Sequence, residues 1–256
     1  MSLFVKSLKH LEMLLRRWGY ERVVPQHITR DDFFALYFSL KQQPFVLQIG
    51  ANDGKTYDPL YEHMSTHTVS GLLVEPLHDV FLRLKDNYAH NAHMQCVNVA
   101  IEEKDGDVPF YRIKPDLVLP GKEYKASSGS SFYRNDVIEN VKHRLPPYRS
   151  NVLRHIGDDP NDYIEEVSVK GVTLASLCTQ YEVKKIDFVL IDCQGFDYEI
   201  LKQFDFTRFS PDVINYEHCL LSPTDLKASR ELLERQGYRY FIHEGDTCAY
   251  KIHVLK

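Results

Sequence analysis

The feature that most constrains the fold is a series of short apolar segments that alternate with helical stretches from Phe45 onward. Most of their residues are apolar, which is typical of strands buried on both faces of a parallel sheet. The helical stretches between them provide the crossovers that parallel strands need. Only Glu244, Gly245 and Asp246 separate the last two segments. This short connection predicts an antiparallel hairpin, so we expect a mostly parallel sheet closed by an antiparallel pair.

Seven segments are predicted strands of this sheet, rich in aliphatic and β-branched residues. They cover residues 45–49, 71–75, 94–100, 187–192, 212–217, 238–243 and 247–254. Helices are predicted between them at residues 77–88, 173–181, 197–203 and 224–236. This order predicts an α/β fold with helices on both faces of one sheet.

Two regions lie outside this alternation. Residues 1–43 form a predicted helical leader with amphipathic helices at 3–18 and 32–38. These helices either cover the core or contact a second copy of the chain, and we favour the first alternative. The remaining domain, 44–256, contains a proline-rich insertion at about 114–164. This insertion is either a lid for substrate recognition or a partly disordered loop.

The insertion has predicted strands on both sides. The segments 108–113 and 165–172 carry strand-like patterns, and we expect them to pair across its base. Inside the insertion, a polar cluster of serines and glycine occupies residues 127–131.

Composition excludes several classes of protein. The net charge of -5 argues against a general nucleic-acid binder, which usually has a basic excess. Five scattered cysteines without a Cys-x-x-Cys pair indicate reduced thiols and neither a disulfide framework nor a zinc cluster. Lys6, Lys9 and Glu12 interrupt the apolar N-terminus, and no segment has the roughly 20 apolar residues of a membrane helix. We therefore expect a cytoplasmic protein without a membrane or nucleic-acid partner.

The first predicted strand ends in a glycine-rich turn, Gly50-Ala51-Asn52-Asp53-Gly54. A strand that leads through such a turn into a helix presents free backbone N–H groups at the carboxyl edge of a sheet, where ligands of open α/β folds bind. The turn lacks the Gly-x-Gly-x-x-Gly spacing of a dinucleotide site, and the glycine spacing of a phosphate-binding P-loop. By itself it indicates either a plain turn or a ligand site.

Three further strand ends carry polar residues. Glu75 closes the second strand. A carboxylate at this position can accept both hydroxyls of an adenosine ribose. Because Pro76 follows it, the carboxylate can also cap the N-terminus of a helix. Asp192 closes the strand at 187–192, and we expect it beside the first strand, close to any ligand at the glycine-rich turn. Glu217 and His218 reach the same edge at the end of the next strand.

At these residues the chain resembles the FkbM family of S-adenosylmethionine-dependent methyltransferases. The resemblance spans residues 45–250 and implies a class I methyltransferase fold, Rossmann-like, with seven strands of which the last two are antiparallel. It also implies methyl transfer from S-adenosylmethionine, generally to a hydroxyl of a small metabolite or sugar. The matching segments are "QIGANDGKTYDPLY", "GLLVEP", "NVAI", "VTLASLC", "IDFVLIDCQGFDYEIL", "PDVINYEH" and "GYRYFIHEGDTCAY".

The chain departs from the family at one motif. Many members carry Asp-x-Glu-Gly after the fourth strand, whereas this chain has Asp192-Cys193-Gln194-Gly195. Asp192 is then the acidic group at this position, and a role for the family's glutamate as base or metal ligand is in doubt. This departure leaves a non-catalytic, cofactor-binding relative as an alternative function. A nicotinamide-dependent oxidoreductase is a second alternative, although its glycine pattern is absent.

The site predictions follow from the strand ends and the resemblance. The predicted cofactor-binding residues are Gly50, Asn52, Asp53, Gly54, Glu75, Pro76, Asn98 and Asp192. The candidate catalytic residues are Asp192, Glu217 and His218. We predict no metal site, although paired carboxylates such as Asp192 and Glu217 are ligands that Mg²⁺ accepts. His243, Asp246 and residues 127–131 either line the acceptor pocket or serve turns and loops.

Overall fold

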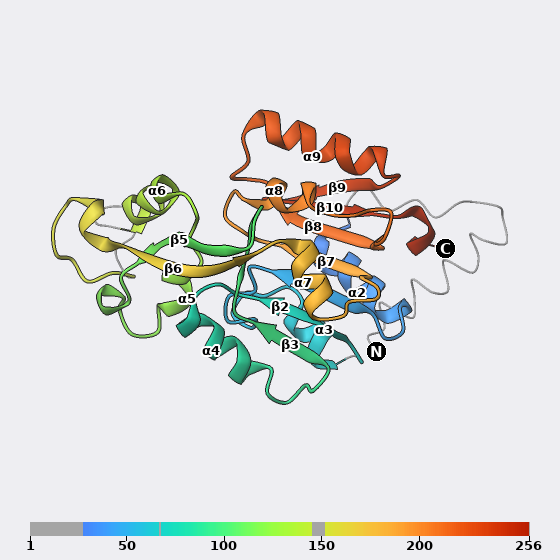
Figure 1. The fold of residues 1–256 in the computed structure, drawn as a ribbon, viewed down its shortest axis with the longest axis horizontal. Helices are drawn as coiled ribbons and strands as arrows, with labels where there is room; N and C mark the ends of the chain where they lie inside the picture. The colour runs from blue at the N-terminus through green and yellow to red at the C-terminus, as the bar shows by residue number, and fades with distance from the viewer. Residues whose placement is uncertain (1–27, 67, 145–151, 256) are drawn as a thin grey trace.

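A computed structural model describes residues 28–66, 68–144 and 152–255. The predicted helix at 3–18 lies outside these residues. The described chain contains a seven-stranded sheet in the order β3-β2-β1-β7-β8-β10-β9, with helices on both faces (Figure 1). The α/β prediction is confirmed.

The strands of this sheet are close to the predicted segments. β1 pairs in parallel with both β2 and β7, which places Ile49 beside Val74 and Ile191. The three strands therefore end together, and the loops that follow them meet at one edge. The strands are β1 (Phe45–Ile49), β2 (Ser70–Val74), β3 (Met94–Val97), β7 (Phe188–Ile191), β8 (Val213–Glu217), β9 (Arg239–His243) and β10 (Asp246–Tyr250).

The C-terminal pair is antiparallel, as the short connection predicts. β10 pairs antiparallel with β9, and it also pairs antiparallel with β8. The last strand therefore lies between the two preceding ones. An antiparallel last strand between its two predecessors is the arrangement expected of the class I methyltransferase fold.

Helices cover the two sheet faces with separate apolar clusters. Val46 and Leu47 are consecutive in β1 and belong to different clusters, because adjacent side chains of a strand point to opposite faces. Residues of α7, α8 and α9 pack on the Leu47 side, and residues of α2 and α3 on the Val46 side. The helices are α2 (Arg30–Leu40), α3 (Tyr61–Thr66), α4 (His78–Asn87), α7 (Leu174–Gln180), α8 (Asp197–Lys202) and α9 (Pro223–Arg235).

Helix α2 is part of this core. Thr29 caps its N-terminus by accepting a hydrogen bond from the Asp32 backbone N–H. Four aromatic side chains of α2 are buried against the sheet, and the Phe34 ring packs edge-on against Phe188 of β7 at 4.9 Å. The helix that the sequence predicts at 32–38 thus covers the core, the alternative that we favour.

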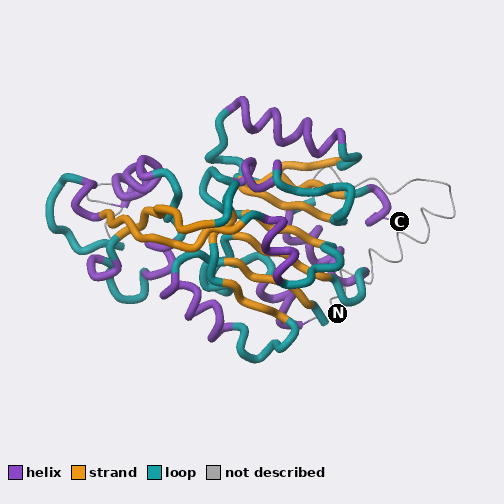
Figure 2. Tube along the Cα trace, viewed as in Figure 1, coloured by secondary structure: helices purple, strands orange, loops and turns teal. Residues whose placement is uncertain are grey.

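The insertion is a folded unit with its own apolar cluster. β5 (Gly106–Ile113) and β6 (Ile164–Val172) pair antiparallel at its base, as predicted. The unit extends from the carboxyl edge of the main sheet (Figures 1 and 2). Its cluster includes buried side chains from both strands and from the segments between them. Those segments contain η1 (Pro115–Leu117), α5 (Glu123–Ser127), α6 (Arg134–Arg144) and η2 (Pro160–Tyr163).

Two local predictions are wrong, and one helix was missed. The strand predicted at 94–100 ends at Val97, and β4 (Ala100–Ile101) pairs instead with β6 in a second sheet, because the chain leaves the main sheet at Asn98. The strand predicted at 247–254 ends at Tyr250, whose partner Val213 is the first residue of β8, and η3 (Ile252–Leu255) follows. Helix α3, which begins at Tyr61, was not predicted.

Candidate active site

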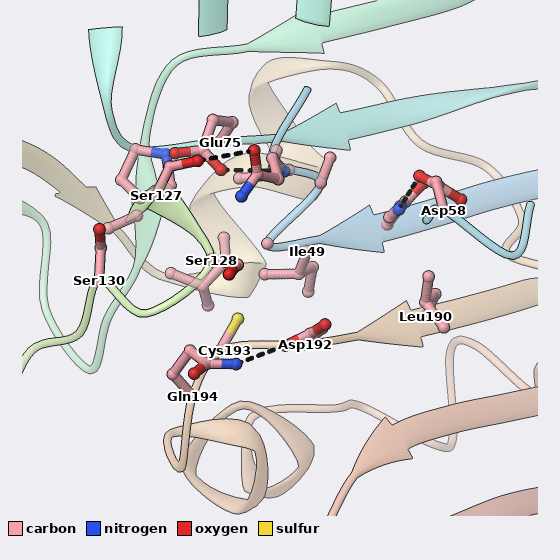
Figure 3. A pocket seen from close by; sticks show the side chains of 18 of the residues that line it. Ile49, Asp58, Glu75, Ser127, Ser128, Ser130, Leu190, Asp192, Cys193 and Gln194 are labelled. Carbon is pink, nitrogen blue, oxygen red and sulfur yellow. Dashed lines mark hydrogen bonds between the residues drawn. The ribbon is translucent and has the colours of Figure 1, made fainter. Parts of the chain in front are cut away.

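A cavity lies where the loops after β1, β2 and β7 meet (Figure 3). It encloses about 850 Å³ of empty space, a volume that includes the open solvent at its mouth. The insertion supplies the remaining wall through α5 and the serines that follow it. The predicted site residues on its wall are Gly50, Asn52, Glu75, Pro76 and Asp192, whereas Asp53, Gly54, Asn98, Glu217 and His218 are not among the described lining residues.

Both glycines of the turn are required by close packing. Gly50 has φ +79°, and a Cβ atom there would lie 1.9 Å from the carbonyl oxygen of Asp192. β1 and β7 therefore approach each other at the base of the cavity more closely than any side chain allows. Gly54 has a different role, because its Cβ would lie 2.4 Å from the Cδ1 of Leu84 in α4.

Asn52 joins three parts of the site. Its φ of +49° turns its backbone N–H toward Glu75, whose Oε2 accepts a hydrogen bond of 3.0 Å. Its Oδ1 accepts a 3.1 Å bond from the Ser127 hydroxyl of the insertion. Asp53 shapes the turn itself, because its carboxylate accepts bonds from the Thr56 backbone N–H and hydroxyl.

Glu75 combines the two roles that its position allows. Its Oε1 accepts a 2.9 Å bond from the backbone N–H of Leu77, the N-cap of α4, and its Oε2 holds Asn52. The side chain is 6% exposed, and burial raises its pKa to about 7. The carboxylate thus organises the turn while it faces the cavity.

Asn98 supports this loop from behind. Its amide donates 2.8 Å bonds to the backbone oxygens of Glu75 and Pro76, and its Oδ1 lies 3.0 Å from His78 Nδ1. These contacts engage both ends of the amide with protein groups, so the amide has a structural role.

A glutamine bridges two of the candidate catalytic carboxylates. Gln194 Nε2 donates to Asp192 Oδ1 at 3.1 Å and to Glu217 Oε2 at 3.0 Å. Only the amide nitrogen has two hydrogens to donate, so the two acceptors determine its orientation. Burial raises the pKa of Asp192, and burial together with Asp192 raises the pKa of Glu217 to about 8. The pair therefore retains a proton near neutral pH.

His218 lies beside this pair without reaching the cavity wall. Its backbone N–H donates to the Gly245 oxygen, and its Nδ1 lies 3.1 Å from the Thr247 hydroxyl. Burial lowers its pKa, so the imidazole is neutral at pH 7. Asp246 is similarly engaged, with Arg30 at 2.6 Å. These two residues stabilise the hairpin junction.

Sequence reasoning missed a polar corner of the cavity. Gln48 Nε2 donates a 2.7 Å bond to Asp58 Oδ2, while Gln48 Oε1 has no partner among the described residues. Burial raises the pKa of Asp58 to about 6. Gln48 sits inside an apolar strand and Asp58 precedes a proline, so the one available signal was the polar side chain within a buried strand.

The insertion contributes aromatic and hydroxyl groups. Ser127, Ser128 and Ser130 line the cavity, as one of the two interpretations of this cluster predicts. The Tyr124 ring lies 5.5 Å from the ring of Tyr57, centroid to centroid. Phe110 and Phe132 form an edge-to-face pair at 5.0 Å on the apolar side of the cavity. Tyr124 and Phe132 were not predicted, because the insertion has no periodic pattern.

Two further properties concern the described residues alone. Within them, no three His, Cys, Asp or Glu side chains form a group suited to a metal ion. No helix of the described ranges has the length and apolar content to cross a bilayer.

Comparison with known proteins gives one family match and structural likenesses at low sequence identity. The family model described as "Methyltransferase FkbM domain" matches residues 48–240. A precorrin-6y C5,15-methyltransferase from Geobacter metallireducens is 13% identical, with a TM-score of 0.41 over 90% of this chain and 94% of that chain. A methyltransferase from Geobacter sulfurreducens is 11% identical, with a TM-score of 0.41 over 95% of this chain and 87% of that chain. The search of curated proteins gives no significant match.

Proposed function

This chain belongs to the FkbM methyltransferase family, and we propose that it transfers the methyl group of S-adenosylmethionine to a hydroxyl of a small metabolite or sugar. The observation that carries the proposal is the meeting of Gly50, Asn52 and Glu75 on one cavity wall at the carboxyl ends of β1 and β2. Ligands of open α/β sheets bind at this edge.

The residues of the cavity fit the cofactor. The wall contains the carboxyl groups of Asp58, Glu75 and Asp192. Carboxylates suit a ligand with a sulfonium, an ammonium and ribose hydroxyls. The apolar side, with Phe110 and Phe132, suits a purine ring.

We assign residue roles on this basis. Glu75 accepts the ribose hydroxyls, and the turn at Gly50 and Asn52 lies against the methionine portion. When bound, the cofactor supplies an activated methyl group, so the protein creates no electrophile. Its tasks are to align the acceptor oxygen, exclude water and receive a proton. Alignment contributes on the order of 7–11 kcal/mol, and a general base roughly 10²–10⁴-fold in rate.

Asp192 is the best-placed proton acceptor in this proposal. Its side chain lies on the cavity wall, where it is hydrogen-bonded to Gln194 and to Glu217. Glu217 acts through Gln194, because it shares that amide and is not on the described wall. His218 remains a weaker candidate, since its ring nitrogen contacts Thr247.

Calorimetric titration tests the proposal. S-adenosylmethionine should bind the unmodified protein, and Glu75→Ala should weaken binding at least 10-fold, whereas Glu103→Ala removes an exposed glutamate and should leave affinity unchanged. Equal affinity in Glu75→Ala and wild type would refute the ribose assignment. Absence of binding to wild type would remove the methyltransferase proposal itself.

A non-catalytic relative is the second candidate, and one observation favours it. Gln194 replaces the acidic residue of the family motif and holds both carboxylates that remain. A protein of this kind would bind the cofactor without releasing S-adenosylhomocysteine for any acceptor. Methyl transfer that is lost in Asp192→Asn, with cofactor affinity retained, would decide for the enzyme.

A further inference from the structure

We propose that Asp197 is a positioning residue for the candidate catalytic carboxylates. Its carboxyl group holds the turn that carries Gln194 in the conformation in which the glutamine amide bridges Asp192 and Glu217. The importance of this role for catalysis rests on the proposed methyl transfer, in which Asp192 receives a proton. The contacts that carry the inference belong to the turn itself and do not depend on the acceptor.

The turn between β7 and α8 has a strained backbone. It spans residues 193–196 and is closed by a 3.2 Å hydrogen bond from the Phe196 N–H to the Cys193 oxygen. Its two central residues both have positive φ, +50° at Gln194 and +94° at Gly195. This combination is typical of a type I′ turn, and it is unfavourable for a glutamine because of the Cβ atom. A residue keeps such a conformation where the surrounding structure imposes it.

Asp197 provides hydrogen bonds that impose this conformation. Its Oδ2 accepts 3.3 Å bonds from the backbone N–H groups of Cys193 and Gly195, the residues immediately before and after Gln194. The Asp197 side chain is completely buried, and the residue begins α8, whose apolar side chains pack in the main core. The core therefore fixes the carboxyl group, and the carboxyl group fixes the backbone on both sides of Gln194.

The backbone of the turn determines where the Gln194 amide lies. Its Nε2 donates to Asp192 at the end of β7 and to Glu217 at the end of β8 (Figure 3 shows the bond to Asp192). A different φ at Gln194 would aim the side chain away from these two oxygens. The two donated bonds favour the ionised form of the carboxylates, so the pair should hold its proton more tightly without them.

Asp197 acts through its hydrogen bonds rather than through its charge. Its Oδ1 is buried and has no partner among the described residues. Burial, with the nearby carboxyls of Asp192 and Glu217, raises the pKa of Asp197 well above its usual range, so the group is neutral at pH 7. Two further titratable groups lie beside the turn, the Cys193 thiol, whose pKa burial also raises, and the Asp136 carboxyl of α6. An amide at position 197 can therefore replace the carboxyl.

Titration of the carboxylate pair tests the inference without knowledge of the acceptor. The full chain is labelled with ¹³C at the glutamate carboxyl carbons, and the Glu217 signal, identified by its absence in Glu217→Gln, is followed by NMR against pH. Asp197→Asn keeps an acceptor oxygen and should leave the pKa of Glu217 unchanged. Asp197→Ala removes both bonds to the turn and should raise that pKa by about 0.5–1. Glu199→Ala removes a carboxylate of α8 that pairs with Lys202, and as the control it should change nothing.

The direction of the change separates position from charge. An ionised Asp197 would repel the pair, so both substitutions would lower the pKa of Glu217, and this result would overturn the inference. A pKa that is unchanged in Asp197→Ala would also overturn it. If Asp197→Ala does not fold, Asp197→Asn still decides, because an unchanged pKa supports the inference and a lowered one contradicts it.

A double substitution shows whether Asp197 acts through Gln194. In Gln194→Met the bridge is already absent, so the further change Asp197→Ala should not raise the pKa of Glu217 again. A second increase as large as in wild type would contradict the positioning role. Calorimetry with S-adenosylmethionine is a separate measurement. Absence of binding to the unmodified protein would remove the proposed methyl transfer, while the NMR titration would still decide the role of Asp197.

Discussion

The two ends of the cavity are built by different means. At the proposed cofactor end, Gly50, Asn52 and Glu75 follow adjacent strands, so the register of β1 and β2 fixes their positions. At the proposed acceptor end, Tyr124 and Ser127 come from a unit with a separate apolar cluster. Sheet topology therefore determines the first end, whereas tertiary packing of an irregular segment determines the second. Substitutions at the first end should reduce stability and cofactor binding, and substitutions at the second end should change binding of the acceptor.

The largest effect is expected for Gly50→Ala. The added Cβ would overlap the Asp192 carbonyl oxygen at 1.9 Å, so β1 and β7 must separate. Unfolding in urea should show a loss of about 3–5 kcal/mol in stability, together with loss of cofactor binding. Gly121→Ala is the matched control, because Gly121 has φ +75° and nothing lies within 4 Å of its Cβ. The control should lose about 1–2 kcal/mol, and equal losses in the two variants would contradict the close approach.

The next effect concerns the charge of Glu75. Its pKa is raised from 4.5 to about 7 by burial, so the folded protein holds the proton more tightly than the unfolded chain. The stability that this provides is complete below pH 4.5 and is lost as the pH rises through 7. Glu75→Gln removes the titration. Its stability relative to wild type should therefore rise by about 3 kcal/mol between pH 4.5 and pH 8.5.

Urea unfolding of both proteins across this pH range measures the difference, and Glu103→Gln serves as the exposed control. A constant difference between wild type and Glu75→Gln would show that the carboxyl titrates normally. Cofactor affinity should fall in Glu75→Gln at every pH, because the second carboxylate oxygen is missing.

The sequence predicts the residues at the strand ends better than the residues that the insertion contributes. Apolar runs with polar residues at their ends located Gly50, Glu75 and Asp192, because strands of a parallel sheet end at one edge. The C-terminal hairpin and the pairing of β5 with β6 were also predicted from the sequence. Tyr124 was not, because its position depends on the path of the chain between Ile113 and Ile164. Local sequence does not encode that path.

Some predicted residues have supporting roles in the structure. Asp53, Gly54 and Asn98 belong to the motif that resembles the family, yet they hold the turn, contact α4 and brace the Glu75 loop. A motif identifies residues that a site requires, but it does not separate those that face the ligand from those that position them. That distinction needs the direction of each side chain.

A smaller effect is expected at Gln194, which bridges Asp192 and Glu217. Gln194→Glu places a third carboxylate between Asp192 and Glu217 and removes two donated hydrogen bonds. Stability should fall by about 1–3 kcal/mol at pH 8 and recover at pH 5, where a protonated glutamic acid donates one bond. Gln194→Met removes the two hydrogen bonds without adding charge, so its reduced stability should persist at pH 5. Thermal unfolding at the two pH values compares them, and a Gln194→Glu profile without pH dependence speaks against the bridge.

The smallest effect tests whether the two ends communicate at all. The Ser127 hydroxyl lies 3.1 Å from Asn52 Oδ1 and also near the Glu123 and Tyr124 carbonyl oxygens, so its single proton is shared among three acceptors. Ser127→Ala should therefore cost at most about 1 kcal/mol and weaken cofactor binding about 2–5-fold in calorimetry. Ser128→Ala is the control, because Ser128 Oγ donates to the Lys125 oxygen of its own helix. If both variants bind the cofactor equally, the insertion positions the acceptor without influence on the Asn52 turn, and the two ends are independent.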